Sequence, residues 1–247
     1  RKVIKIVLPA YNEEETILPL IMDIKRILGE RFSAFEVIVV NDGSTDNTAR
    51  IVSELNLPML KLVEHTRNKG LSESIKAGLL YSLKNTDEND IIVTMDADNT
   101  HSPGLIYRMS TFIEEGNDVV IASRYRSGAR VIGLTMARKT ISFGGNMLFR
   151  LLFPTRGVRD YTSGYRAYRA GFLCKAFELW EDSFINEPGF SCQVDILLKL
   201  RKMRAIINEV PLILRYDQKE SASKMNVTST MIDTLKLVVK RVLRIYK

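Results

Sequence analysis

The chain lacks long apolar runs. No stretch approaches the roughly 18 consecutive apolar residues that predict a membrane-spanning helix. No secretory signal precedes the first predicted strand, near residues 3–8, so we expect a soluble or peripheral protein in the cytoplasm. Cysteine is also scarce. Cys174 and Cys192 have no metal-ligand spacing, and their apolar neighbours predict buried free thiols.

Internal repeats, low-complexity tracts and linker-like segments are absent as well. A length of 247 residues suffices for one large α/β domain whose core needs no disulfide. We therefore predict a single domain over residues 1–226, with halves at 1–101 and 102–226, followed by a C-terminal helix at 227–247.

Acidic residues are in deficit, and the net charge is +7. Much of the excess lies in the tail, where eight Lys or Arg oppose three acids from Arg215 onward. Residues 227–247 place apolar side chains at helical spacing, with cations on the other side. Such a helix either packs on its own domain or lies on an anionic membrane surface, and the sequence leaves both open.

The first half of the chain has alternating strand and helix patterns. Strands are predicted near residues 3–8, 36–40, 59–64 and 91–95, and helices near 13–29, 46–55 and 70–84. This alternation predicts an α/β fold with a mostly parallel sheet covered on both faces. The second half predicts a helix near 102–115, a strand at 118–122, a loop at 124–138, a helix at 139–152 and a turn at 160–166.

Polar segments follow three of the predicted strands. They are residues 9–14 (Pro-Ala-Tyr-Asn-Glu-Glu), 41–44 (Asn-Asp-Gly-Ser) and 96–98 (Asp-Ala-Asp). Because ligands bind beyond the carboxyl ends of parallel strands, we expect these segments to converge on one crevice. The two carboxylates of Asp96 and Asp98, at the end of a buried strand, are costly unless a cation compensates them. Their oxygen ligands suit Mg²⁺ or Mn²⁺.

These segments occur in the order found in family 2 glycosyltransferases of the GT-A fold, which the chain resembles over roughly residues 3–225. The resemblance is greatest to the branch of polyprenyl-phosphate (dolichyl-phosphate) mannosyl- and glucosyltransferases. It implies that the first half binds a nucleotide diphosphate sugar, a GDP- or UDP-hexose. The residues implied in nucleotide-sugar binding are Pro9, Tyr11, Glu13, Asp42, Arg67 and Asp96.

The resemblance also implies that Asp96 and Asp98 hold a divalent metal against the diphosphate. That branch usually reads Asp-Ala-Asp-Leu-Gln-His-Pro-Pro, and its Gln helps to hold the metal. Here Thr100 stands in the place of that Gln. We take Thr100 as the third candidate ligand, acting through its hydroxyl or an intervening water, and His101 as a ligand or a supporting residue.

Cationic motifs in the second half also match this branch. The resemblance implies that Arg124, Arg138, Ser142, Arg166 and Lys224 bind the phosphate of the acceptor. A phosphate monoester is already an anion and needs cations rather than a base, and arginine suits bidentate phosphate contacts. The implied reaction is inverting transfer of a hexose, mannose or glucose, to a polyprenyl phosphate, with Asp98, Arg124 and Arg138 as catalytic candidates. No nucleic-acid partner is implied.

Asp195 leaves an alternative open. It lies where many family 2 enzymes have the base that deprotonates a hydroxyl acceptor, so we include it among the catalytic candidates. It is equally consistent with a carboxylate that anchors the start of a helix. A further alternative, suggested by Thr100, is an inactive protein that binds nucleotide sugars.

Overall fold

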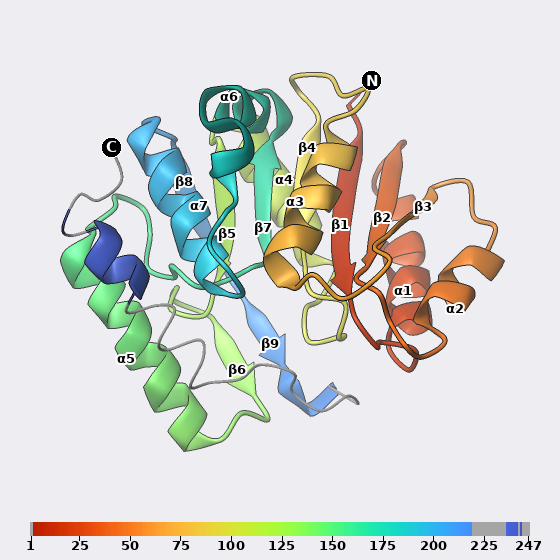
Figure 1. The fold of residues 1–247 in the computed structure, drawn as a ribbon, viewed down its shortest axis with the longest axis horizontal. Helices are drawn as coiled ribbons and strands as arrows, with labels where there is room; N and C mark the ends of the chain where they lie inside the picture. The colour runs from red at the N-terminus through yellow and green to blue at the C-terminus, as the bar shows by residue number, and fades with distance from the viewer. Residues whose placement is uncertain (1, 219–235, 242, 244–247) are drawn as a thin grey trace.

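The computed structural model of the chain describes residues 2–218, 236–241 and 243 (Figure 1). Its centre is a sheet of seven strands in the order β3-β2-β1-β4-β7-β5-β8. The strands are β1 (Ile4–Ala10), β2 (Phe35–Asn41), β3 (Leu60–Glu64), β4 (Ile91–Thr94), β5 (Val119–Ser123), β7 (Arg166–Arg169) and β8 (Ile207–Pro211). Only β7 runs antiparallel to its neighbours in this sheet. The predicted α/β fold is therefore confirmed.

Helices cover both faces of the sheet (Figure 1). One face carries α1 (Ile17–Gly29), α2 (Thr48–Glu54) and α4 (Leu105–Glu114), and the other carries α3 (Leu71–Ser82), α6 (Ala170–Trp180) and α7 (Ser191–Lys202). Short 3₁₀ helices follow α6 and β9, at Glu181–Phe184 and Tyr216–Gln218. The predicted helix near 13–29 begins only at Ile17, because residues 11–16 form the polar turn after β1.

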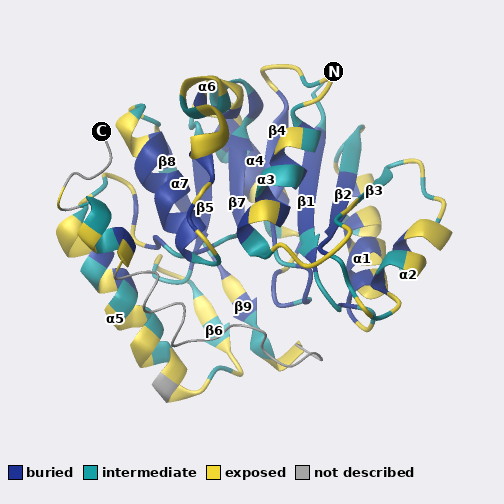
Figure 2. Cartoon of the chain, viewed as in Figure 1, coloured by how far each residue is buried: buried dark blue, intermediate teal, exposed yellow. Residues whose placement is uncertain are grey.

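Strand β1 shows why the sheet is buried on both sides. Ile6 and Leu8 pack in the core beneath α1, whereas Val7 packs in the core beneath α3. Parallel strands covered by helices on both faces are apolar at successive positions for this reason. Figure 2 shows the result: the central strands β1, β4, β5 and β7 are mostly dark blue, and many exposed residues lie on the helices.

A small second layer lies at the carboxyl edge of the sheet. It contains β6 (Arg130–Ile132) and β9 (Ile213–Arg215), which pair in parallel, and the long helix α5 (Met136–Leu152) beside them (Figure 1). The predicted loop at 124–138 was therefore partly wrong, since it contains β6 and the first turn of α5. Arg215 N–H donates to Thr100 O at 3.0 Å, which ties β9 to the loop after β4.

Part of the predicted C-terminal helix is described, at residues 236–241, and it is helical. Leu237 is fully buried in the core on the α7 side, and Lys240 Nζ lies 3.1 Å from Glu187 Oε1. This part of the helix packs on its own domain. The boundary at residue 226 lies outside the described residues and stays a prediction, as does the division at residue 101.

Two further expectations concern the membrane and the thiols. Within the described part of the chain, no helix is long and apolar enough to span a bilayer. Cys192 is buried as predicted, and burial raises the pKa of its thiol to about 12. The prediction for Cys174 was wrong, because this residue lies on the exposed side of α6.

The contact between α3 and β1 generates a stability prediction. A Cβ at Gly78 would overlap Val7 Cγ1 and lie 3.0 Å from Val40 Cγ2. We expect Gly78→Ala to lower the free energy of unfolding by about 1–3 kcal/mol, because a packed core resists added volume. The matched control is Gly144→Ala in α5, where no atom lies within 4 Å of the added Cβ. This change should raise stability by roughly 0.5–1 kcal/mol through helix propensity. Urea unfolding measures both, and equal effects would contradict the packing argument.

Candidate active site

The site lies where the order of the strands reverses. Strand β1 pairs with β2 on one side and with β4 on the other, so the loops that follow β1 and β4 are neighbours. Thr16 Oγ1 lies 2.9 Å from Glu13 Oε2 in the first loop and 3.0 Å from Ala97 O in the second. The first and third polar segments therefore meet, as the sequence predicted.

The first loop is also bound to the loop after β2. Asn12 adopts a left-handed conformation with φ of 53°, and its N–H donates to Ser44 Oγ at 3.0 Å. Its side chain accepts from Thr45 N–H at 2.8 Å. Pro9 precedes this turn in β1, and Tyr11 is half-buried within it. The predicted nucleotide-binding residues of the first loop thus belong to a turn that short polar side chains hold in shape.

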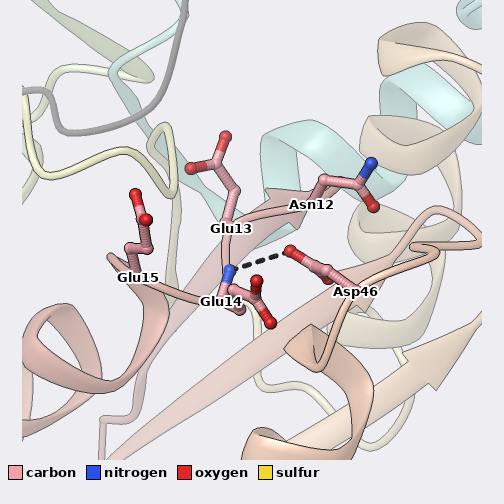
Figure 3. A pocket seen from close by; sticks show the side chains of 5 residues that line it. All are labelled: Asn12, Glu13, Glu14, Glu15 and Asp46. Atoms are coloured by element: carbon pink, nitrogen blue, oxygen red, sulfur yellow. Dashed lines mark hydrogen bonds between the residues drawn. The ribbon is translucent and has the colours of Figure 1, made fainter.

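A shallow cavity of about 250 Å³ lies beside this turn (Figure 3). It is lined by Asn12, Glu13, Glu14, Glu15 and Asp46, and Glu14 N–H donates to Asp46 Oδ2 at 3.1 Å. Four carboxylates would repel a diphosphate. We therefore do not assign the donor's phosphates to this cavity, although Glu13 belongs to both the cavity and the predicted donor loop.

Asp42 binds its own chain with both carboxylate oxygens. Oδ1 lies 2.7 Å from His65 Nδ1 and accepts from Lys69 N–H at 3.0 Å, while Oδ2 accepts from Gly70 N–H at 2.8 Å. A carboxylate only accepts, so His65 carries its hydrogen on Nδ1. Asp42 therefore orders the turn at 65–70, which presents Arg67 to solvent.

Gly43 explains how closely these two segments approach. Its φ is +66°, and a Cβ would lie 2.6 Å from both Arg67 Cα and Asn68 N. Only glycine fits that approach without displacing the backbone. His65 was missed by sequence reasoning, since nothing in the local pattern pairs it with a carboxylate 23 residues earlier.

Asp98 and Thr100 form a local unit after β4. Asp98 Oδ1 accepts from Thr100 N–H at 3.2 Å and from Thr100 Oγ1 at 2.6 Å. Both residues are buried, with 8% and 2% of their surfaces exposed, whereas the Asp96 side chain is 41% exposed. The Thr100 hydroxyl is therefore directed at one of the two predicted metal ligands.

His101 binds the backbone of Asp96. Its Nδ1 accepts from Asp96 N–H at 3.3 Å, so in the neutral ring the hydrogen lies on Nε2, 4.0 Å from Asp96 Oδ2. The ring stacks on Tyr165 with centroids 4.9 Å apart, and Tyr165 donates to Ser102 O. Burial raises the pKa of Tyr165 above its ordinary value. His101 thus helps to orient the loop that contains Asp96 and Asp98.

The protein supplies only part of a metal coordination shell here. Among the residues that the structure describes, no group of three or more His, Cys, Asp or Glu side chains could hold a metal ion. Mg²⁺ is commonly bound through one or two carboxylates together with phosphate oxygens of a substrate. Asp96 and Asp98, with the Thr100 hydroxyl, fit an ion that is shared with a bound diphosphate.

The turn at 160–166 lies against the end of β4. Thr94 Oγ1 donates to Gly164 O at 2.7 Å. A Cβ on Gly164 would lie 3.7 Å from Asp96 Oδ1 and 3.3 Å from Gln193 Nε2. The turn that the sequence assigned to the acceptor is thereby brought beside a predicted metal ligand.

Arg124 is held by a buried carboxylate. Its Nε and Nη2 donate to the two oxygens of Asp160 at 2.9 and 2.8 Å, and Nη1 donates to Ser142 Oγ at 3.1 Å. Burial disfavours both charges, but the ion pair outweighs it: the pKa of Asp160 is lowered and that of Arg124 is raised. Asp160 was not among the predicted site residues.

Ser142 and Arg138 lie on neighbouring turns of α5. Besides the bond from Arg124, Ser142 Oγ lies 3.2 Å from the hydroxyl of Tyr125. Arg138 is exposed, and it has no ion-pair or hydrogen-bond partner among the described residues. The structure therefore brings together Arg124 and Ser142, with an accessible cation one turn away. Lys224 lies outside the described residues.

The prediction that Arg166 binds the acceptor phosphate is contradicted by the structure. Its side chain is fully buried, and its three guanidinium nitrogens donate to the backbone carbonyls of Ser163, Gln193 and Tyr161 at 2.8, 2.8 and 3.0 Å. A guanidinium engaged in this way is not available to an acceptor phosphate. Arg166 instead holds the turn at 160–166 against the start of α7.

The prediction that Asp195 is a catalytic base is contradicted by the structure. It is 1% exposed and forms ion pairs with Lys199 and Arg241, so it cannot reach the proton of an acceptor hydroxyl. Residues two apart on a helix point about 200° apart. Gln193 accordingly faces Gly164 while Asp195 faces away. Gln193 Oε1 is buried without a hydrogen-bond partner among the described residues.

The Arg124–Asp160 pair generates a prediction on stability and pH. We expect Asp160→Asn to lower the free energy of unfolding by about 3–5 kcal/mol at neutral pH, because it leaves a buried guanidinium without its countercharge. The folded-state pKa of Asp160 lies below the ordinary 3.8. The contribution of the pair is therefore present above pH 3.8 and is lost as the pH falls through the folded-state pKa.

Denaturant unfolding at several pH values measures this difference between the variant and the wild type. The control is Asp217→Asn, which removes a solvent-exposed partner of Arg215 and should change stability little. If the difference in free energy of unfolding between Asp160→Asn and the wild type did not become smaller in acid, the ion pair would not be its cause.

Comparison with known proteins agrees with this geometry. Residues 5–177 match the sequence profile of Glycosyl transferase family 2. A dolichol-phosphate mannosyltransferase of Pyrococcus furiosus is 32% identical over 210 residues, which cover 84% of this chain and 55% of that protein. A polyprenol monophosphomannose synthase of Mycolicibacterium smegmatis is 30% identical over 224 residues, 90% of this chain and 80% of that one. The chain thus spans little more than half the length of the Pyrococcus relative.

Among solved structures, glucosyl-3-phosphoglycerate synthase from Mycobacterium tuberculosis, in complex with Mn²⁺, uridine-diphosphate and phosphoglyceric acid, has the same fold. The TM-score is 0.68 at 22% identity, over 98% of this chain and 78% of that one. Because the family profile spans well over half of the sequence and the strand order brings the family's motifs to one crevice, this chain belongs to glycosyl transferase family 2 and has the GT-A fold.

Proposed function

We propose that this protein transfers a hexose from a nucleotide diphosphate sugar to a polyprenyl phosphate, with inversion at the sugar and with a divalent metal. The observation that carries the proposal is the chemistry of the acceptor side, which offers cations among the described residues and where the candidate base, Asp195, is buried. Arg124 is bonded to Ser142, one turn of α5 from the exposed Arg138, whereas Asp195 and Glu187 are buried and ion-paired. An anionic phosphate acceptor needs no deprotonation, so this arrangement suits it.

The donor side supports binding of a nucleotide diphosphate. The Asp42-ordered turn presents Arg67 to solvent beside the loop after β2, and that loop is bonded to the first loop, where Tyr11 and Glu13 lie. The names of the relatives favour mannose over glucose as the hexose. Both GDP and UDP remain candidate carriers, because no described side chain distinguishes one base from the other.

Asp96, Asp98 and Thr100 would hold Mg²⁺ or Mn²⁺ together with the diphosphate. The ion would act as a Lewis acid on the leaving diphosphate. Thr100 donates its hydroxyl hydrogen to Asp98, which leaves the oxygen lone pairs of Thr100 available as ligands. The Gln193 amide, beside Gly164 and Asp96, is a candidate contact for the sugar.

Arg124 and Arg138 have different roles toward the acceptor phosphate. Arg124 is oriented by Asp160, so it presents a fixed positive charge, whereas Arg138 has no partner among the described residues and can bind a phosphate directly. Held by these cations, a phosphate oxygen of the acceptor attacks the sugar on the face opposite the leaving group, which gives a β-linked product. Because the proposed acceptor is a lipid, we expect the reaction at a membrane surface, on the cytoplasmic face.

The first test is transfer from a panel of nucleotide sugars with Mg²⁺ or Mn²⁺, with and without a short-chain, water-dispersed polyprenyl phosphate. We expect product only when the lipid phosphate and a metal are both present. Turnover that is indifferent to the lipid phosphate would refute the proposed acceptor. Tight nucleotide-sugar binding without turnover would indicate an inactive binding protein.

The metal site generates its own prediction. Asp98→Asn should lower the transfer rate by at least about 100-fold, because it removes a charged ligand of the ion. The amide oxygen can still accept from Thr100, so the fold should persist. Thr100→Ser should retain activity and Thr100→Val should lose much of it, and circular dichroism checks the fold of each. Full activity of Thr100→Val would exclude the hydroxyl as a ligand.

Arg138 tests the acceptor. Arg138→Ala should raise KM for the short-chain acceptor by roughly 10- to 100-fold, the cost of one lost charged hydrogen bond, and leave KM for the donor unchanged. The matched control is Arg150→Ala, which removes another exposed cation from the same helix. Equal KM values for the two variants would argue against a phosphate contact at Arg138.

A further inference from the structure

The amide of Gln193 is buried without a hydrogen-bond partner. Gln193 is the third residue of α7 and is 2% exposed. Among the described residues, its Oε1 accepts no hydrogen bond and its Nε2 donates none. A buried polar group without a partner has lost the hydrogen bonds that water would give it, which costs free energy. Such a group in a folded protein requires an explanation, and a ligand that supplies the missing bonds is one.

The amide borders the same space as a predicted metal ligand. Gln193 Nε2 and Asp96 Oδ1 lie 3.3 and 3.7 Å from the position that a Cβ on Gly164 would occupy. Because residue 164 is a glycine, no side chain fills that position. Strand β4 lies between β1 and β7, and Gly164 precedes β7, so this space is on the side of β4 opposite the donor loops.

The start of α7 is held on two sides, so the amide has a fixed place. Arg166 Nη1 donates to Gln193 O at 2.8 Å. Val194 packs in the core, and Asp195 is ion-paired with Lys199. Rotation of α7 that moved the amide elsewhere would expose Val194 and break these contacts. The fold therefore holds Gln193 beside Asp96 although the amide has no bond of its own.

The position of the amide indicates which part of the substrates it meets. In the proposed complex the metal at Asp96 and Asp98 holds the diphosphate, and Arg124 lies on the acceptor side. The transferred hexose is the part that lies between the diphosphate and the acceptor. Hydroxyl groups on adjacent ring carbons each donate and accept a hydrogen bond. A carboxamide has an acceptor oxygen and an N–H₂ donor, so it can bind two adjacent hydroxyls together.

We propose that Gln193 recognises the transferred sugar and sets the preference for a neutral hexose. Its Oε1 accepts from one ring hydroxyl and its Nε2 donates to the next. A sugar that carries a carboxylate is disfavoured, because neither the amide nor Asp96 has a positive charge to offer it. A site built around a hydroxyl also rejects an analogue that lacks it, since the buried polar group then stays unpaired. This inference deepens the proposed function and rests on it for the identity of the donor.

The first test is calorimetric binding with Mg²⁺ and without any acceptor. GDP-mannose and UDP-glucose are compared with GDP and UDP, and the sugar nucleotide that binds more tightly is used further. Gln193→Met nearly keeps the length of the side chain and removes the amide. We expect this variant to bind the sugar nucleotide about tenfold more weakly, through one lost hydrogen bond to a buried group, and to bind the bare nucleotide as the wild type does.

The matched control is Val194→Ala, which removes core packing from the neighbouring residue of α7. It should lower the stability of the protein and change neither affinity more than about twofold. A Gln193 that served only the structure would weaken the bare nucleotide and the sugar nucleotide alike. That result, or unchanged binding of the sugar nucleotide by Gln193→Met, overturns the inference.

Donors that each lack one ring hydroxyl provide a second readout. The wild type should bind the donor that lacks a contacted hydroxyl at least about tenfold more weakly than the parent donor. Gln193→Met should bind these two donors within about twofold of each other, because the partner of that hydroxyl is gone. If the variant discriminated among the deoxy donors as strongly as the wild type, Gln193 would not be the group that recognises the sugar.

Transfer assays separate this inference from the proposed function. Sugar-dependent binding through Gln193 without transfer to the polyprenyl phosphate supports the inference and refutes the proposed acceptor. Transfer with a KM for the donor that Gln193→Met does not raise refutes the inference alone. The KM for the short-chain acceptor should stay unchanged in this variant. A wild-type protein that bound no nucleotide sugar would refute both.

Discussion

The buried carboxylate of Asp160 is the constraint on which the acceptor side depends. It has no exposed surface, and such a charge is tolerated only when its hydrogen-bonding capacity is filled. Arg124 binds it through both oxygens, and the N–H groups of Thr162 and Ser163 donate to Oδ1. The N–H of Asp160 in turn donates to Glu209 Oε1 on β8 at 2.7 Å. Through its side chain and its backbone N–H, Asp160 thus links the residue after β5, strand β8 and the turn before β7.

The two sides of the crevice are built by different means. On the donor side, short polar side chains bind backbone groups of neighbouring loops: Asn12 holds the loop after β2, and Asp42 holds the turn at 65–70. These bonds preorganise backbone shape, which suits a flat base and a diphosphate. On the proposed acceptor side, the order comes from an ion pair, which fixes the orientation and the charge of the Arg124 guanidinium. The loop of Asp96 and Asp98 lies between the two.

Helix α5 carries predicted acceptor-site residues and also forms part of the molecular surface. Its inner side is anchored by Asn146 and Phe149, its first turns carry Arg138 and Ser142, and its outer side is apolar. The helix has no acidic residue, and among the described residues its apolar outer side is largely exposed.

The sequence by itself determined the parallel part of the sheet, β1 to β5, and the edge at which the polar segments lie, whereas β7 and β8 were not predicted. Apolar strands alternating with amphipathic helices have few packing solutions, so the strands that end before Tyr11, Asp42 and Asp96 had to bring those residues to one edge. The local Asp-x-Asp pattern and the cations at Arg124 and Arg138 were readable because each is a short motif. Only the tertiary structure decided what surrounds each charge. Arg166 is enclosed by carbonyls, Asp195 by two cations and Arg124 by Asp160, and every one of these partners is at least three residues away in the chain. His65 and Gln193 were missed for the same reason. A motif fixes which groups are available, but burial and distant neighbours set whether a charge binds a ligand or the protein itself.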